Sequence, residues 1–143
     1  MFGRLTRRVR RKGDLVLLEA ALRDADRVIG FNIARFDLPA LSGALGAWVL
    51  ELPTLDLLQE VQHALGHRLS LDHLAEVTLG RRKGGDGLQA LGFYRRGQWR
   101  KLERYCLQDV RLTRDLYEFA KRRGFLWYVP RGKRRRRRFE VTV

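Results

Sequence analysis

Two groups of side chains have the types and spacing for metal-assisted chemistry. In the first, Asn32 follows a short apolar run and Asp37 lies five residues further on, with Phe36 between them expected to anchor in the core. A carboxylate at the end of a buried strand can bind a hard divalent cation, and an asparagine can donate to a backbone group or a nucleotide. A helix-capping aspartate after a turn is the alternative for Asp37.

The second group is Tyr105 and Asp109, which are four residues apart in a predicted helix and therefore share one face. That pairing lets a phenol position a water molecule next to a metal bound by the carboxylate. A Tyr-x-x-x-Asp spacing is also common by chance, so an ordinary helix surface is the alternative.

The elements that position these residues are predicted from apolar periodicity and from Gly, Pro and capping residues. The pattern is typical of an α/β protein that is rich in helices and short of strands. The predicted helices cover residues 15–23, a short helix ending near Gly43 or Gly46, 55–65, 71–78, 88–95 and 99–122. The predicted strands cover residues 28–31, 48–50 (or an extended link there), and 125–129 paired as a hairpin with 139–143.

Basic residues are concentrated at both ends of the chain of 143 residues. Its net charge of +14 comes from 30 Lys and Arg against 16 Asp and Glu. Residues 1–12 hold six of the basic groups and residues 131–138 hold seven, with no acidic group in either segment, so the rest of the chain is nearly neutral. Such arms attract phosphate backbones through counterion release without reading sequence. Solvated tails that aid solubility are the alternative.

Residues 80–87 form a basic, glycine-rich loop that contains Arg81, Arg82 and Lys83. The glycines would allow close approach of a phosphate to the backbone, although the loop lacks the Gly-Lys-Ser/Thr ending of a nucleotide P-loop. A plain mobile surface loop is equally compatible with this composition.

The apolar runs, the single cysteine and the three histidines indicate which classes of protein are excluded. No run approaches the length of a membrane span and no signal-peptide core follows the basic N-terminus, so we expect a cytoplasmic protein. The single cysteine, Cys106, excludes an internal disulfide and is expected to be a buried, inert thiol. The three histidines lack acidic partners at metal-ligand spacing, and a structural or exposed role is favoured for them.

The two groups of side chains, in this order and about seventy residues apart, resemble motifs two and three of the DEDD-type 3′–5′ exonucleases. Gly30-Phe31-Asn32 with Phe36-Asp37-Leu38-Pro39 is similar to the Asn-x4-Asp form of motif two in family B polymerase proofreading domains and their bacterial relatives. Tyr105 to Asp109 is similar to motif three of the Tyr-bearing branch. The resemblance covers roughly residues 24–129 and implies an RNase H-like fold.

The resemblance also implies roles for single residues. Asp37 and Asp109 would be two of four carboxylates that bind Mg²⁺ or Mn²⁺, and Tyr105 would orient the attacking water. Asn32 and Phe36 would support the strand end and the terminal nucleotide of the substrate. The implied partner is nucleic acid, with DNA favoured over RNA.

The chain departs from the family pattern in one respect, because it contains no Asp-x-Glu, the first motif. We therefore expect an N-terminally incomplete RNase H-like domain at residues 13–130, between a basic arm at 1–12 and an arginine-rich segment with a terminal strand at 131–143. Alone it should have little or no exonuclease activity; a non-catalytic nucleic-acid- or protein-binding module is the alternative. Apolar helix faces at 55–65 and 101–119 should be partly exposed, which favours a homo-oligomer or a partner chain that supplies strands.

Overall fold

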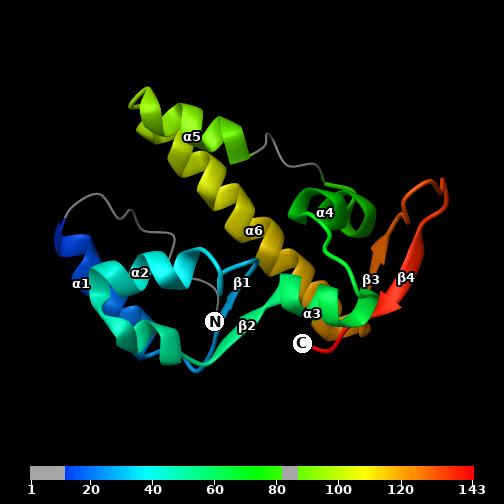
Figure 1. The fold of residues 1–143 in the computed structure, drawn as a ribbon, viewed down its shortest axis with the longest axis horizontal. Coiled ribbons are helices and arrows are strands. Elements are labelled where there is room, and N and C mark those ends of the chain that lie inside the picture. Colours follow the sequence, from blue (N-terminus) through cyan, green and yellow to red (C-terminus); the bar gives the residue numbers. More distant parts are fainter. Residues whose placement is uncertain (1–11, 82–86) are drawn as a thin grey trace. The chain divides into compact units, whose positions relative to one another are not determined.

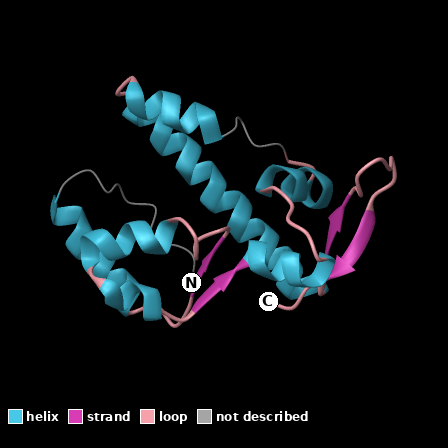
Figure 2. Ribbon diagram, viewed as in Figure 1, coloured by secondary structure: helices cyan, strands magenta, loops and turns pink. Residues whose placement is uncertain are grey.

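The computed structural model describes residues 12–81 and 87–143 of the chain (Figure 1). The chain forms two compact units, the first ending at Leu57 and the second spanning Leu58–Val143. Helices make up most of both units, and each contains one pair of strands (Figure 2). Within the described residues, no helix combines the length and the apolar character that crossing a membrane requires.

The first unit is built around a pair of short parallel strands. Strands β1 and β2 pair in a register that places Val28 opposite Thr54 and Gly30 opposite Asp56. Because the strands are parallel, their carboxyl ends meet at the same edge of the pair. The elements of this unit are α1 (Lys12–Arg23), β1 (Val28–Gly30), α2 (Asp37–Leu45), the 3₁₀ helix η1 (Ala47–Glu51) and β2 (Thr54–Asp56).

The core of the first unit forms where the segment after β1 packs against α2 and η1. Ile33, Leu38 and Val49 are buried together, with partly buried apolar side chains packed around them. Gly30 permits this packing, because a Cβ atom at that position would lie 2.0 Å from Cγ2 of Ile33. Ile33, after β1, and Leu38, in α2, therefore hold the end of β1 against the start of α2.

The second unit combines helices with an antiparallel hairpin. In this hairpin, β3 and β4 pair with Leu126 opposite Phe139 and Trp127 opposite Arg138. Gly124, with a φ of 75°, ends the long helix just before β3 begins. The elements are α3 (Leu57–Leu65, beginning at the last residue of the first unit), α4 (Leu71–Leu79), α5 (Gly87–Arg95), α6 (Trp99–Arg123), β3 (Phe125–Tyr128) and β4 (Arg137–Glu140).

Two side chains of α4 tie that helix to β3. The Thr78 hydroxyl accepts a hydrogen bond from the backbone N–H of Trp127 at 3.0 Å and donates to its carbonyl at 3.1 Å. Nε2 of His73 accepts a hydrogen bond from the backbone N–H of Val129 at 3.0 Å. Buried Leu74, Leu116 and Leu126 add apolar contacts, so the hairpin rests on a packed helical base.

Most of the predicted elements are confirmed; one is wrong, and two are present with shifted bounds. Residues 47–51 form the 3₁₀ helix η1 rather than a strand or extended link at 48–50. The helix predicted at 55–65 begins only at Leu57, because Thr54–Asp56 pairs with β1 as a strand. Strand β4 covers Arg137–Glu140 instead of residues 139–143, so it begins inside the arginine run. The helix-rich α/β composition is confirmed.

Candidate functional site

Asp37 is the first residue of α2 and is exposed. The turn that leads to it begins at Asn32, whose φ of 62° lies in the left-handed region that asparagine tolerates better than most residues. The backbone N–H of Leu38 donates to the carbonyl of Ile33 at 2.9 Å, and the buried Leu38 side chain fixes the first turn of the helix. The predicted position of Asp37 at a helix start is therefore confirmed.

The side chain that holds this turn in place is Asp56, which the sequence analysis did not single out. Asp56 is the last residue of β2 and is 5% exposed. Its Oδ1 accepts a hydrogen bond from the backbone N–H of Asn32 at 2.7 Å, and its Oδ2 accepts one from Ala34 at 3.1 Å. Hydrogen bonds from N–H groups to a carboxylate are among the stronger ones, so Asp56 fixes the turn after β1.

Asp56 also acts electrostatically on the Asp37 carboxyl. The pKa of the Asp37 carboxyl is raised above its ordinary value of 3.8, chiefly because neighbouring protein atoms displace part of its water. A hydrogen bond with its own backbone acts in the opposite direction, and the nearby negative charge of Asp56 raises the pKa further. Lost hydration, with a smaller contribution from the charge of Asp56, therefore disfavours the ionised form of Asp37.

Tyr105 and Asp109 lie on α6 in the second unit, four residues apart and both half-buried. Further along the helix, Leu112 and Leu116 are buried and anchor it in the unit. Cys106, next to Tyr105, is exposed, so the expectation of a buried thiol is wrong. One face of α6 thus carries a phenol and a carboxylate, and one oxygen of that carboxylate, Oδ1 of Asp109, is buried.

The residues predicted to contact nucleic acid differ in their surroundings. Asn32 is half-buried, whereas Phe36 is 66% exposed and does not anchor in the core, because Leu38 fills that role. Arg81 is exposed and pairs with Asp115 on α6, whose other oxygen accepts a hydrogen bond from Nε of Arg114 at 2.8 Å. Arg82 and Lys83 lie outside the described residues. Nucleic-acid contact by all five residues stays a prediction.

The described side chains that could bind a metal are divided between the two units. Asp37 and Asp56 belong to the first unit, and Tyr105 and Asp109 belong to the second. In residues 12–81 and 87–143, no three His, Cys, Asp or Glu side chains gather in a way that could hold a metal ion. Both oxygens of Asp56 already accept backbone N–H groups. The pairing of Asp37 with Asp109 around a metal stays a prediction.

The histidines have the structural or exposed positions expected of them. His63 and His67 are exposed, and His67 makes an edge-to-face contact with the ring of Tyr128. His73 accepts the hydrogen bond from Val129 described above, which requires Nε2 to be unprotonated. His73 therefore has a structural role at the junction of α4 and β3.

Comparison with known proteins gives one match. A family model described as the RNase H superfamily matches residues 7–121 of the chain, a range that contains Asn32, Asp37, Tyr105 and Asp109. No curated protein and no solved structure matches the chain significantly.

Proposed function

Because the chain belongs to the RNase H superfamily, we propose that it is a nucleic-acid-binding domain related to the metal-dependent 3′–5′ exonucleases of the Tyr-bearing DEDD branch. The observation that carries this proposal is that the family match spans both motif segments, with Asp37 at a helix start and Tyr105 and Asp109 on one helix face. Nuclease-like function on nucleic acid is what this superfamily suggests.

The proposed roles follow from the types of side chain. Asp37 and Asp109 are carboxylates suited to Mg²⁺ or Mn²⁺, and Tyr105 is placed one helical turn from Asp109, where a phenol can orient water. The exposed ring of Phe36 is suited to stacking on a terminal base, and Asn32 to donating a hydrogen bond to it. Arg81, Arg82 and Lys83 would contact phosphates.

We further propose that this chain alone has little or no exonuclease activity. The branch uses four carboxylates, whereas the sequence contains no Asp-x-Glu and the described residues form no three-ligand group. A site with two carboxylates would bind a divalent ion weakly and would not hold two ions. Catalysis would then require carboxylates from outside this sequence.

Two measurements on the full chain test the proposal. Isothermal titration with Mn²⁺ should show weak binding that is lost in Asp37→Ala and in Asp109→Ala. Asp24→Ala, which removes an exposed aspartate of the first unit, serves as the matched control and should leave binding unchanged. A 3′-labelled single-stranded DNA should bind the chain and remain undegraded in the presence of Mn²⁺.

The outcomes separate the proposal from its alternatives. Degradation of the DNA by the wild-type chain, abolished in Asp37→Ala and Asp109→Ala, would show that the chain holds a complete catalytic centre. DNA binding without any Mn²⁺ binding would favour a non-catalytic nucleic-acid-binding module. Absence of both kinds of binding would overturn the proposed function.

A further inference from the structure

We propose that the β3–β4 hairpin, residues 125–140, is a binding surface for the phosphate backbone of nucleic acid, with Arg136 and Arg138 as its positioned contacts. This inference rests on the proposed function only for the choice of nucleic acid as the partner. It assigns the binding to a structured element that lies outside the motif residues and beyond the end of the family match at residue 121.

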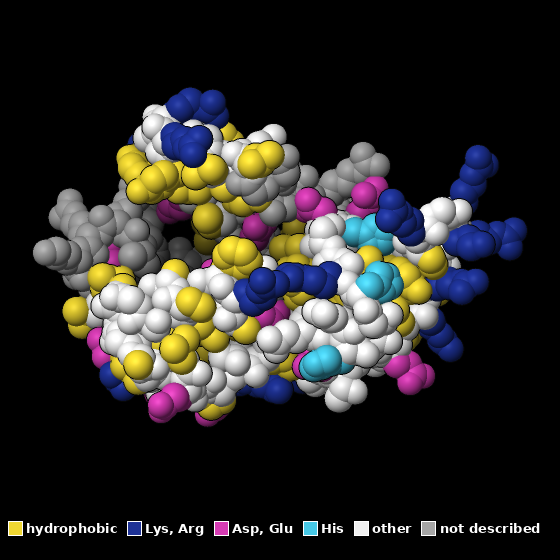
Figure 3. Space-filling view, viewed as in Figure 1, with side chains coloured by type: hydrophobic (Ala, Val, Ile, Leu, Met, Phe, Trp, Pro, Cys, Tyr) yellow, Lys and Arg dark blue, Asp and Glu magenta, His cyan; other side chains and the backbone are white. Residues whose placement is uncertain are grey.

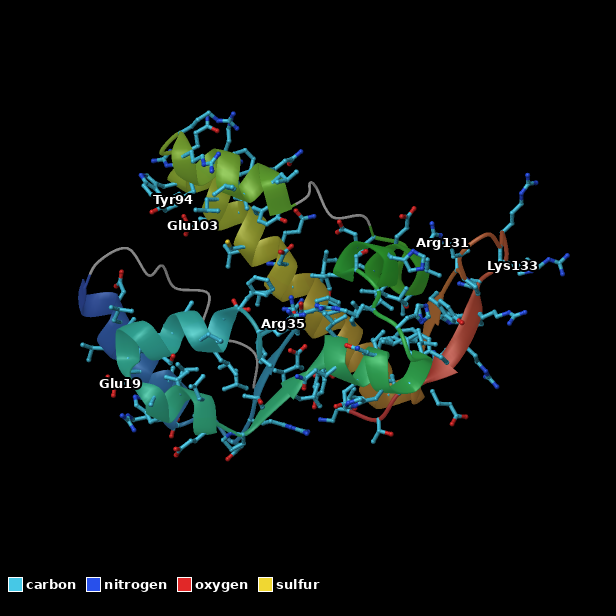
Figure 4. All side chains as sticks on the ribbon, in the orientation of Figure 1. Glu19, Arg35, Tyr94, Glu103, Arg131 and Lys133 are labelled. Carbon is cyan, nitrogen blue, oxygen red and sulfur yellow. The ribbon has the colours of Figure 1, made fainter. Side chains whose placement is uncertain are left out.

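The hairpin carries the densest positive charge among the described residues. Seven of the eight residues from 131 to 138 are Arg or Lys, none is acidic, and all eight are exposed. In Figure 3 these Lys and Arg side chains extend from the hairpin. Figure 4 labels Arg131 and Lys133 on the connection between the two strands. Neutralising such a cluster with phosphates releases counterions and favours binding.

Two of these arginines are held in place rather than freely solvated. Cζ of Arg136 lies 4.4 Å from the ring centroid of Trp127, and Cζ of Arg138 lies 5.4 Å from that of Phe125. A guanidinium group stacked on a ring still presents its N–H edge, which matches the geometry of a phosphate. Stacking also reduces the side-chain freedom that is lost on binding.

The aromatic rings are themselves fixed to the body of the second unit. Phe125 makes edge-to-face contacts with Trp127 at 5.6 Å and with Phe119 of α6 at 5.7 Å between centroids. The backbone of Trp127 is held by both hydrogen bonds of Thr78, and Leu126 and Phe139 on the opposite face are buried. The two arginines are therefore presented by a rigid support instead of a flexible arm.

The chemistry of the surface favours a polynucleotide over a lipid membrane. Six of the seven basic residues are arginine, the side chain best suited to phosphate groups. Among the described residues, the exposed large apolar side chains all lie outside the hairpin, and its aromatic rings are partly buried, so it offers little apolar surface for insertion into a bilayer. One guanidinium group lies over the ring of Trp127 and one over the ring of Phe125, which favours contacts with the backbone over base stacking.

The test measures the binding of fluorescein-labelled single-stranded DNA to the full chain by anisotropy at several salt concentrations. Arg136→Gln/Arg138→Gln should weaken binding by about ten- to a hundredfold. It should also reduce the slope of log K against log salt by about 1.4, because each phosphate that an arginine neutralises on a single strand adds roughly 0.7 to that slope. The matched control, Arg95→Gln/Arg100→Gln, removes the same charge from two exposed arginines of α5 and α6 and should change both quantities by less than half as much.

A second pair of substitutions separates positioning from charge. Arg136→Lys/Arg138→Lys keeps the charge but loses the planar fork, so it should keep the salt slope while weakening binding severalfold. Two DNA strands of unrelated sequence, and an RNA of the same sequence as one of them, should bind with similar affinity if the phosphates are the ligand. Circular dichroism melts of each variant check that the fold is retained.

Several results would overturn the inference. Equal affinity and slope for wild type and the glutamine variant, with the wild type binding DNA, would reject the hairpin and leave the proposed function standing. An equal loss in the control variant would show that only net charge matters. Binding to phosphatidylserine vesicles that depends on Arg136 and Arg138, with DNA binding independent of them, would identify a lipid surface instead. A wild-type chain that binds no nucleic acid would overturn this inference together with the proposed function.

Discussion

Asp37 and Asp56 bring two carboxylates into one small region of the first unit, and they have different tasks. Asp56 is buried, and both of its carboxylate oxygens accept hydrogen bonds from backbone N–H groups, so it stabilises the turn after β1. Asp37 is exposed at the helix start, and its raised pKa reflects lost hydration and the nearby charge of Asp56. Ionisation of this carboxyl therefore destabilises the folded protein. Such perturbed groups are typical of binding sites.

This electrostatic cost predicts how stability depends on pH. Because the pKa of Asp37 is higher in the folded protein than its ordinary 3.8, the folded state binds that proton more readily than the unfolded chain. The stability that the folded state gains from holding the proton of Asp37 is fully present below pH 3.8. It is lost as the pH rises through the raised pKa of Asp37. Asp37→Asn should therefore raise the unfolding temperature at neutral pH, and this gain should disappear below pH 3.8.

Thermal unfolding followed by circular dichroism from pH 3 to pH 7 measures the effect. Asp26→Asn removes one negative charge from an exposed position between α1 and β1 and controls for the change in net charge. A gain for Asp37→Asn that does not exceed that of the control at neutral pH would contradict the prediction. A gain that persists unchanged into acid would mean that ionisation of Asp37 is not its cause.

At the residue level, sequence patterns predicted the placement of some candidate residues and missed others. Asp37 follows an apolar strand and a turn, so local signals sufficed to place it at a helix start. Asp56 was missed because an aspartate beside a run of leucines also fits the first turn of a helix. The structural role of Asp56 arises from hydrogen bonds with residues more than twenty positions away in the sequence. No local sequence pattern contains such bonds.

At the scale of elements, the errors have the same origin. Leu55, Leu58 and Val61 repeat with helical spacing, which masked the short strand that pairs with β1. The second strand of the hairpin was predicted to begin at residue 139, after the arginine run. The strand begins earlier, at Arg137, where its backbone pairs with Tyr128 of β3, and the arginines of β4 are exposed to solvent. Local periodicity identified the helices, whereas strands held by partners distant in sequence needed the fold.

A substitution of Asp56 tests the hydrogen bonds that join the end of β2 to the segment after β1. In Asp56→Asn, an amide NH₂ replaces one acceptor oxygen and faces a backbone N–H, so one buried donor loses its partner. The free energy of unfolding should fall by about 1–3 kcal/mol. Urea denaturation measures this loss, and hydrogen exchange at the amides of Asn32 and Ala34 should become faster.

Glu51→Gln is the control for this substitution, because Glu51 is an exposed acid at the end of η1 in the same unit. It should leave both the unfolding free energy and the exchange of the two amides unchanged. Protection of Asn32 and Ala34 that survives in Asp56→Asn would show that the turn is held by its apolar contacts and not by this carboxylate.

For the whole molecule, apolar surface is exposed at places other than those expected from the sequence. The two helices predicted to have partly exposed apolar faces bury most of these side chains. The buried ones are Leu58, Val61, Leu112 and Leu116, whereas Val110 is exposed. Large exposed apolar side chains instead gather on α5 and the start of α6, at Leu88, Leu91, Tyr94 and Trp99. The first three repeat every third residue and so share a helix face, and Tyr94 contacts Trp99 edge to face at 5.5 Å between centroids.

Exposed surface of this kind favours association, and the pairs β1–β2 and β3–β4 each contain only two strands within the described residues. We therefore expect the full chain to self-associate in sedimentation velocity as its concentration rises, and to do so at least as well at high salt, because salt screens the repulsion between chains of net charge +14 but does not screen apolar contacts. Leu88→Ser/Leu91→Ser should shift the association to higher concentration. Leu50→Ser, at an exposed leucine of η1 in the first unit, should leave the association unchanged.

A compact monomer at every concentration would contradict the expectation of an oligomer. A partner chain would then be the remaining candidate to cover this surface.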